Sequence, residues 1–208
     1  MRRVRRNLVL IGGLLILFPT RAAHAQVAPT PVDFRPFSDA RFWIVKQPLV
    51  YRVGISKDSV VVPRGFVTDF ASIPPVLQSL IQQNSANLLP AVVHDFLYWT
   101  QVCTRVQSDQ LLKLAMIENR VATAQRVAIY AAVRAVGSFA WDSDRAERQR
   151  GMVHLLPESR LNVPPLADWQ AYQATMKVDG IVDAPYAPIS PGFCHRGDMS
   201  VEGALQTR

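Results

Sequence analysis

The chain has 208 residues, of which 49% are hydrophobic and 19% are charged, and its net charge is +7. The arginines at positions 2, 3, 5, 6 and 21 all fall in the first 25 residues, where there is no acidic residue, and without them the net charge is +2. Such a balanced remainder lacks the basic surface that binding to a phosphate backbone requires, so no nucleic-acid partner is expected.

Residues 1–25 have the pattern of a secretory signal segment. An arginine-rich start is followed by an apolar run from Leu8 to Phe18 and by the small-residue sequence Ala23-His24-Ala25. The run is shorter than the roughly 20 residues of a membrane-spanning helix, so we expect export with cleavage and a periplasmic or secreted location. The alternative is an uncleaved anchor, in which case the protein would contact the membrane only through this segment.

Two cysteines, Cys103 and Cys194, lie in the remaining 183 residues. Exported proteins meet oxidising conditions, so a disulfide between them is expected, with two unpaired thiols as the alternative. Two cysteines without a Cys-x-x-Cys spacing do not indicate a zinc site.

The first part of this remainder favours strands. Residues 26–39 are predicted to be a proline-containing lead-in, and residues 41–45, 49–53 and 59–62 are rich in β-branched and aromatic residues. Gly54 to Asp58 separates the second and third of these runs. A β-hairpin or a three-stranded meander is therefore predicted.

Helices are predicted to follow the strands. Residues 88–101 form the first, residues 109–119 form the second with Ser108 as its cap, and a third begins near Thr123. The core stripe expected for the third helix consists of Ile129, Ala132, Val133, Val136 and Ala140. Strands followed by helices indicate an α+β domain, here a small antiparallel sheet and a three-helix unit.

Residues 142–208 are predicted to be a C-terminal extension of the domain at 40–141. The dense charges between Asp142 and Arg150 are typical of a solvated helix end, and the six prolines between Pro157 and Pro191 interrupt long elements. We expect an irregular, proline-rich segment with one short helix around residues 166–177.

Two motifs carry a family resemblance. The first runs from Val62 to Pro74 as Val-Pro-Arg-Gly-Phe-Val-Thr-Asp-Phe-Ala-Ser-Ile-Pro, and the second is His94-Asp-Phe-Leu-Tyr98. With the Pro48-Leu-Val-Tyr51 strand and the Ser108-to-Leu112 segment, they resemble the bacterial and phage family called domain of unknown function 1353. The resemblance covers about residues 40–141 and implies a shared fold without a settled activity.

A weaker likeness concerns the chemistry. The pattern His-Asp-x-x-Tyr on one helix, with an Asp on the next, is similar to the core of secreted phospholipases A2. That likeness implies His94 as the base that activates water, Asp95 as a calcium ligand and Asp109 as the carboxylate that orients the histidine. The stretch from Asn84 to Pro90 contains no glycine, so no calcium-binding loop supports calcium or another divalent metal here.

Two aspartates are candidate partners of His94. In a symmetric antiparallel hairpin Asp109 lies opposite residue 100, an offset of roughly 9 Å from His94, so contact with Tyr98 or a local pair with Lys113 is simpler. Asp69 either caps the following turn, as Ser72 also could, or turns toward His94 to set its tautomer. Ser72 has no Gly-x-Ser-x-Gly context, which argues against a nucleophilic role.

The sequence therefore predicts one site at the junction of sheet and helices. Its catalytic residues are His94, Asp95, Asp69 and Asp109, with Thr68, Ser72 and Tyr98 on the substrate side, and hydrolysis is the expected reaction. The alternative is a non-enzymatic envelope or phage-related interaction module, in which His94 and the aspartates only stabilise the fold. The partner, whether a small molecule, a lipid or an envelope protein, is left open.

Overall fold

The computed structural model describes residues 33–70, 85–186 and 191–207. In this part of the chain antiparallel strands come first and helices follow, so the predicted α+β class is confirmed. The signal segment and the first half of the lead-in, residues 26–32, lie outside the described residues.

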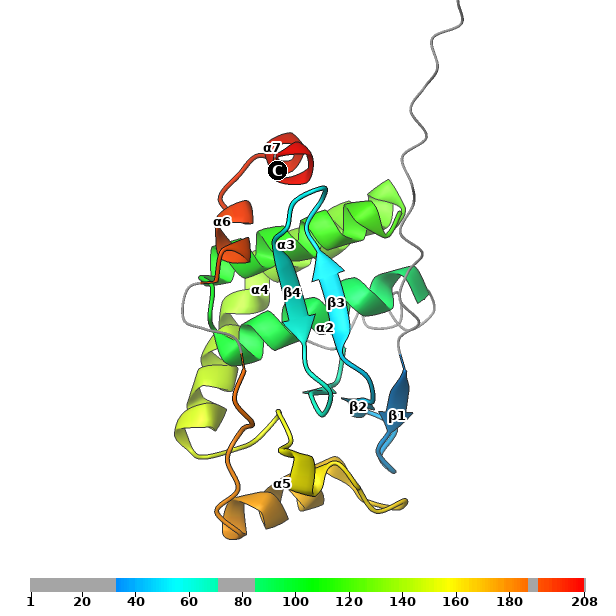
Figure 1. Ribbon diagram of the computed structural model, residues 1–208, viewed down its shortest axis with the longest axis vertical. Coiled ribbons are helices and arrows are strands. Elements are labelled where there is room, and N and C mark those ends of the chain that lie inside the picture. The colour runs from blue at the N-terminus through cyan, green and yellow to red at the C-terminus, as the bar shows by residue number, and fades with distance from the viewer. Residues whose placement is uncertain (1–32, 71–84, 187–190, 208) are drawn as a thin grey trace, which may run out of the picture.

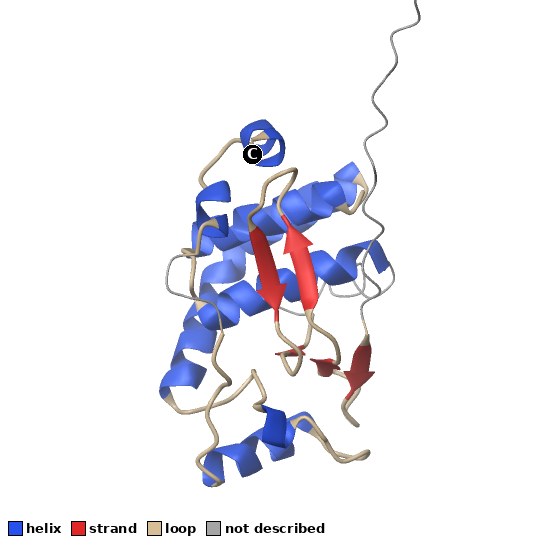
Figure 2. Cartoon of the chain, in the orientation of Figure 1, coloured by secondary structure: helices blue, strands red, loops and turns tan. Residues whose placement is uncertain are grey.

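The strands form two small antiparallel sheets (Figures 1 and 2). One sheet has the order β1-β2-β5, with β1 at Phe34–Pro36, β2 at Trp43–Val45 and β5 at Val67–Thr68. The other is the hairpin of β3 (Leu49–Arg52) and β4 (Ser59–Val62), which confirms the predicted hairpin. A three-stranded meander does not form, because β2 pairs with strands on either side of the hairpin in sequence.

The hairpin covers the helices with one face only. Leu49 and Tyr51 point inward opposite Val62 and Val60, whereas Val50 on the other face is exposed. This alternation follows from the two-residue period of a strand and places an apolar layer against α2, in front of which the hairpin lies in Figure 1.

Helix α2 (Ser85–Thr100) is the centre of the molecule. It packs against the hairpin, β5, α3 (Arg105–Glu118) and α4 (Thr123–Gln149). From Ala91 to Thr100 every residue is buried, so both the predicted core face of this helix and its opposite face lie inside the protein. A helix that is buried on all sides can present polar side chains to two separate interior regions.

The second and third helices differ from the prediction at their starts. Helix α3 begins at Arg105 rather than residue 109, because Thr104 and Gln107 form a capping box, and Ser108 lies inside the helix. The N-cap of α4 is Ala122 and has no side-chain hydrogen bond, so Thr123 does not cap it.

The buried stripe of α4 is also narrower than predicted. It consists of Ile129, Val133, Gly137 and Trp141, spaced four residues apart, whereas Val136 is 51% exposed. Helix α2 approaches this row closely at Gly137, where Tyr98 of α2 occupies the space that a Cβ atom would need. Helix α4 continues without interruption to Gln149, past the boundary expected at residue 141.

Short elements follow α4. They are a 3-10 turn at Glu158–Arg160, α5 (Trp169–Val178), α6 (Phe193–Arg196) and α7 (Val201–Gln206). Helix α5 corresponds to the helix expected near residues 166–177, and Asp168 caps it. A second apolar cluster around Trp169 joins α5 to β2 and β5. Helix α5 lies at the lower end of the molecule in Figure 1.

Candidate functional site

Helix α2 separates the predicted site residues into two groups. Neighbouring helix residues point about 100° apart, so His94 and Asp95 face different regions of the interior. His94 joins a buried network with α3 and α4, whereas Asp95 faces a cavity near β5. In place of the single junction site predicted from the sequence, the structure has a buried network on one side of α2 and a cavity on the other.

Asp109 on α3 is the centre of the buried network. Its Oδ1 accepts hydrogen bonds from Tyr98 Oη at 2.6 Å and lies 3.1 Å from His94 Nε2. Its Oδ2 lies 3.2 Å from Arg105 Nη1 and 2.9 Å from Arg134 Nη1. All four donors thus converge on one carboxylate, which links α2, α3 and α4.

The prediction of contact between Tyr98 and Asp109 is confirmed, but the offset argument against His94 is wrong. The two Cα atoms lie at different heights along the helix pair, but the imidazole and carboxylate side chains together bridge this difference. Lys113 is not the partner of Asp109, since its ammonium lies over the ring of Tyr130 at 4.9 Å.

Burial and hydrogen bonding set the protonation states in this network. Burial lowers the pKa of His94, against the opposing effect of Asp109, so the imidazole is neutral near pH 7. Burial would raise the pKa of Asp109, but its hydrogen bonds with His94, Tyr98 and Arg134 hold that pKa below its ordinary value. Burial and the neighbouring carboxylate raise the pKa of Tyr98.

His94 has no access to solvent. Its side chain is 0% exposed and does not line the cavity, and within the described part of the chain its Nδ1 has no hydrogen-bond partner. Because Nε2 faces a carboxylate, the neutral ring donates from Nε2 and leaves Nδ1 as an acceptor.

On the other side of α2 lies a cavity of about 390 Å³. It is bounded by β5 and the turn after it, by α2, by the second half of α4, by the segment at residue 154 and by α5. This volume lies in the lower part of the range of small-molecule pockets. Its ionisable lining residues are Asp69, Asp95, Asp144, Glu147 and His154.

The first motif supplies one wall of this cavity. Thr68 Oγ1 donates to Asp95 Oδ2 across a distance of 2.5 Å and accepts a hydrogen bond from Phe70 N. Phe70 has a φ of 55°, a left-handed conformation that turns the chain sharply after β5. The turn places Asp69 on the cavity wall beside Asp95, while Ser72 lies outside the described residues.

Asp144 on α4 has a carboxyl group whose pKa is raised above its ordinary value. Burial raises its pKa to about 7, and the negative charges of Glu147 and Asp69 add to this effect. His154 and Arg148 oppose it only in part. A carboxyl group in a cavity that is half-protonated near neutral pH can donate or accept a proton there.

His154 lies between Asp144's helix and the sheet. Its ring stacks on Trp99 with a centroid distance of 4.1 Å, and its Nδ1 lies 3.3 Å from Val67 O. A carbonyl only accepts, so Nδ1 carries a proton and Nε2 faces Glu147 at 3.6 Å. This contact with His154 lowers the pKa of Glu147.

Asp183 holds the Trp99–His154 pair in place. Its Oδ2 accepts from Trp99 Nε1 at 2.7 Å, and its Oδ1 accepts from the backbone N–H groups of His154 and Leu155 at 2.9 and 2.7 Å. The segment after α5 thereby fixes the orientation of a cavity wall built by α2 and the chain after α4.

Asp144, Glu147 and His154 are not among the site residues predicted from the sequence. The charge-rich run from residue 142 suggested a solvated helix end. One signal was present: Ala140, Ser143, Asp144 and Glu147 occupy positions i, i+3, i+4 and i+7, which places them on one face if the helix continues.

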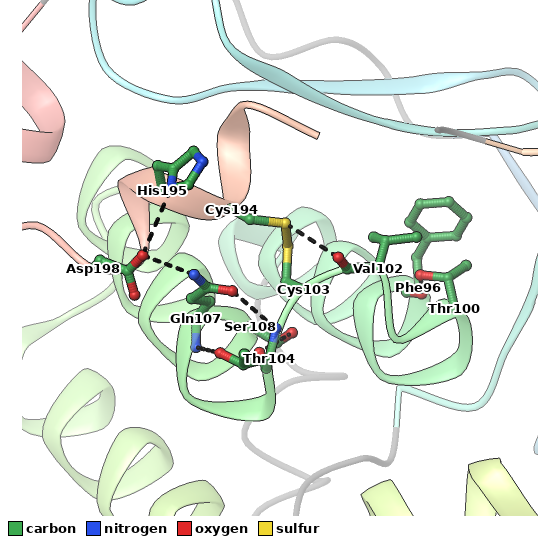
Figure 3. The surroundings of a disulfide bond; sticks show 10 residues. All are labelled: Phe96, Thr100, Val102, Cys103, Thr104, Gln107, Ser108, Cys194, His195 and Asp198. Atoms are coloured by element: carbon green, nitrogen blue, oxygen red, sulfur yellow. Dashed lines mark hydrogen bonds and ion pairs between the residues drawn. A yellow bond between two sulfur atoms is a disulfide. The ribbon is translucent and has the colours of Figure 1, made fainter. Parts of the chain in front are cut away.

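The predicted disulfide between Cys103 and Cys194 is present, with a Cα–Cα distance of 5.3 Å (Figure 3). It joins the loop between α2 and α3 to α6, and neither cysteine lines the cavity. Nearby, Gln107 Nε2 donates to Asp198 Oδ2 at 2.7 Å, and the exposed His195 lies 3.9 Å from the same carboxylate.

Within the described ranges, no group of three or more His, Cys, Asp or Glu side chains is arranged to hold a metal ion. The helices that the structure describes include none long and apolar enough to cross a membrane.

Comparison with known families supports the motif resemblance. Residues 43–133 match the family described as "Protein of unknown function (DUF1353)". The predicted resemblance is confirmed. The matched DUF1353 segment contains β2 to β5, α2, α3 and the first part of α4, and therefore both motifs. Asp144, Glu147 and His154 lie C-terminal to it. No curated protein and no solved structure matches the chain.

Proposed function

We propose that this protein is a hydrolase whose reaction takes place in the cavity between β5, α2 and α4. The observation that supports the proposal is that the fold brings Asp69, Asp95, Asp144 and His154 from three distant segments to one cavity. Structural carboxylates are rarely gathered in this way around open space, because their charges repel one another.

Each carboxylate has a distinct role in the proposed reaction. Asp144 is the general acid, because its pKa of about 7 leaves a proton available near neutrality. Asp95 is the base that activates water, and Thr68 fixes one of its oxygens by a hydrogen bond. Asp69 adds negative charge that keeps the proton on Asp144. This separation of acid and base follows the general pattern of paired carboxyl groups.

His94 and Asp109 take a positioning role in this proposal. Their network is fully buried and connects three helices, so it sets the orientation of α2 and thereby of Asp95. Their burial also favours the second candidate function, an envelope or phage-related interaction module in which the His/Asp motif only stabilises the fold.

We also propose that the protein is exported and works in the periplasm or outside the cell. The disulfide supports this location, because such bonds persist in oxidising compartments. The signal segment predicted at residues 1–25 would provide the route.

The proposed function is tested with a panel of chromogenic esters, amides, phosphates and glycosides between pH 5 and pH 9. We expect turnover by the wild type to fall as the pH rises through about 7, since the protonated form of Asp144 is required. Asp144→Asn should lose at least about 100-fold of the activity.

Asp142→Asn is the matched control, because Asp142 lies on the same helix with its side chain 68% exposed. It should keep wild-type activity. Equal activity of Asp144→Asn and wild type would contradict the proposal, and so would the absence of turnover on the whole panel, which favours the interaction module.

A further inference from the structure

The charges of the cavity lining restrict its ligand. Among the described residues that line the cavity, four are carboxylic acids and none is Lys or Arg. Negative charge on the walls of a cavity repels anions and raises the local concentration of neutral or positive molecules. Phosphate esters and phospholipid head groups therefore do not match this lining, although the likeness to phospholipases A2 suggests them.

The uncharged part of the lining has two kinds of group. Phe42 and the 83% exposed Phe139 offer aromatic surface at the cavity, and Ser143, Gln170 and Gln173 offer hydrogen-bonding groups. Gln173 donates to Val153 O, so its side-chain oxygen is oriented by the fold. A ligand that suits this lining combines an apolar face with several hydroxyl groups on its edges.

We propose that the substrate of this site is a glycoside, and that the bond broken is the one between the anomeric carbon and its exocyclic oxygen. This inference rests on the proposed function. A sugar ring has the required shape, because its C–H face packs against an aromatic ring while its hydroxyls donate to carboxylates and amides. Glycoside hydrolysis also uses two carboxyl groups, and this cavity brings together Asp144, which can hold a proton near neutral pH, and Asp95, which accepts a hydrogen bond from Thr68.

The proposed step is balanced by one water molecule. Asp144 gives its proton to the glycosidic oxygen as the bond to the anomeric carbon breaks, and the electron pair leaves with that oxygen as an alcohol. Water adds to the anomeric carbon, and the proton it loses passes to Asp95. Exchange with solvent then returns both carboxyl groups to their starting states.

The test uses the disulfide-bonded protein and two series of aryl glycosides that differ in their leaving group. Each series contains both β- and α-anomers. In the first series the leaving group is an ordinary phenol, which needs protonation, and in the second it is 2,4-dinitrophenol, which leaves without it. We expect Asp144→Asn to lose at least about 100-fold on the first series and to keep most of its activity on the second. A merely structural effect would lower both series equally.

Two variants serve as further controls. Asp142→Asn should behave as the wild type on both series, because its carboxylate is exposed on the opposite side of α4. Phe139→Ala should raise KM for the glycosides and leave kcat nearly unchanged, since this exposed ring contributes only substrate binding.

The outcomes separate the inference from the proposed function. Turnover of esters or amides, with no glycoside cleaved, would overturn the glycoside assignment and leave the hydrolase in place. Binding of oligosaccharides without turnover would support the ligand class and overturn the hydrolase. Turnover of 4-nitrophenyl phosphate in preference to glycosides would overturn the charge argument itself.

Discussion

Asp142 and Asp144 show how strongly the environment of a single residue determines its chemistry. They are two positions apart on α4 and therefore point about 200° apart around the helix axis. Asp142 is exposed and pairs with Arg145 at 3.5 Å, whereas Asp144 faces the cavity among other acids. The same side chain is thus exposed to solvent at one position, whereas at the other burial raises its pKa to about 7.

This difference predicts an effect of pH on stability. Between pH 4 and pH 7, Asp144 loses its proton in the unfolded chain but keeps it in the folded protein, so its contribution to the free energy of unfolding falls as the pH rises. Asp144→Asn removes this titration. The difference in free energy of unfolding between variant and wild type should therefore shift in favour of the variant by about 2–4 kcal/mol as the pH rises from 4 to 8.

Chemical denaturation of both proteins at pH 4, 6 and 8 measures this gain. The control variant Asp142→Asn should differ from the wild type in its free energy of unfolding by the same amount at all three pH values. A parallel pH dependence for Asp144→Asn and wild type would show that Asp144 is ionised in the folded protein throughout this range.

At the level of secondary structure, the contact between α2 and α4 depends on Gly137. A Cβ atom at this position would lie 2.5 Å from Tyr98 Oη, the hydroxyl that donates to Asp109. The glycine therefore allows the two helices to approach closely enough for the buried network to form. A helix interior otherwise disfavours glycine by roughly 1 kcal/mol relative to alanine.

Gly137→Ala tests this contact. The propensity of alanine favours the variant, but the displaced Tyr98 leaves a buried carboxylate with one donor fewer, so we expect a net loss of about 1–3 kcal/mol. Ser138→Ala, at the exposed neighbouring position, should be neutral or slightly stabilising. Thermal unfolding of the two variants gives the comparison, and a stabilised Gly137→Ala would show that Tyr98 is not confined by α4.

For the whole molecule, the C-terminal segment is tied to the domain at several points. Cys194 is bonded to Cys103, Arg196 Nε donates to Asp58 Oδ2 at 2.6 Å, and Asp183 bonds to Trp99. In Figure 1, α6 and α7 lie at the end of the molecule opposite to α5, so the segment reaches both ends. The cavity is completed by residues from this segment, including Trp169 of α5.

The disulfide should contribute to stability without affecting the cavity. It closes a loop with a sequence separation of 91, for which the chain-entropy model gives roughly 4–5 kcal/mol, a value that measured cases often fall below. The double variant Cys103→Ser/Cys194→Ser should therefore lose about 2–4 kcal/mol. Denaturation under non-reducing conditions measures the loss, and an unchanged midpoint would contradict a structural role.

Sequence patterns were sufficient wherever the interaction is local. The α+β order and the hairpin at β3 and β4 follow from side-chain periodicity and from the turn after Arg52, and a short helix was also expected where α5 lies. The two motifs were identified by their resemblance to a known family. The pairing of Cys103 with Cys194 could also be predicted, because the remainder of the chain has only two cysteines. In these cases the residues that determine the structure are neighbours in sequence or, for the two cysteines, can form only one disulfide.

The tertiary structure alone decided which polar residues meet. His94 and Asp95 are adjacent in sequence, yet the rotation of α2 sends one into a sealed network and the other to a cavity. The sequence places Asp144 in a charge run typical of a solvated helix end, whereas in the folded protein it lines a cavity with residues of β5, α2 and α5. The physical reason is that burial, and with it the protonation of a carboxyl group, depends on segments that are far away in sequence.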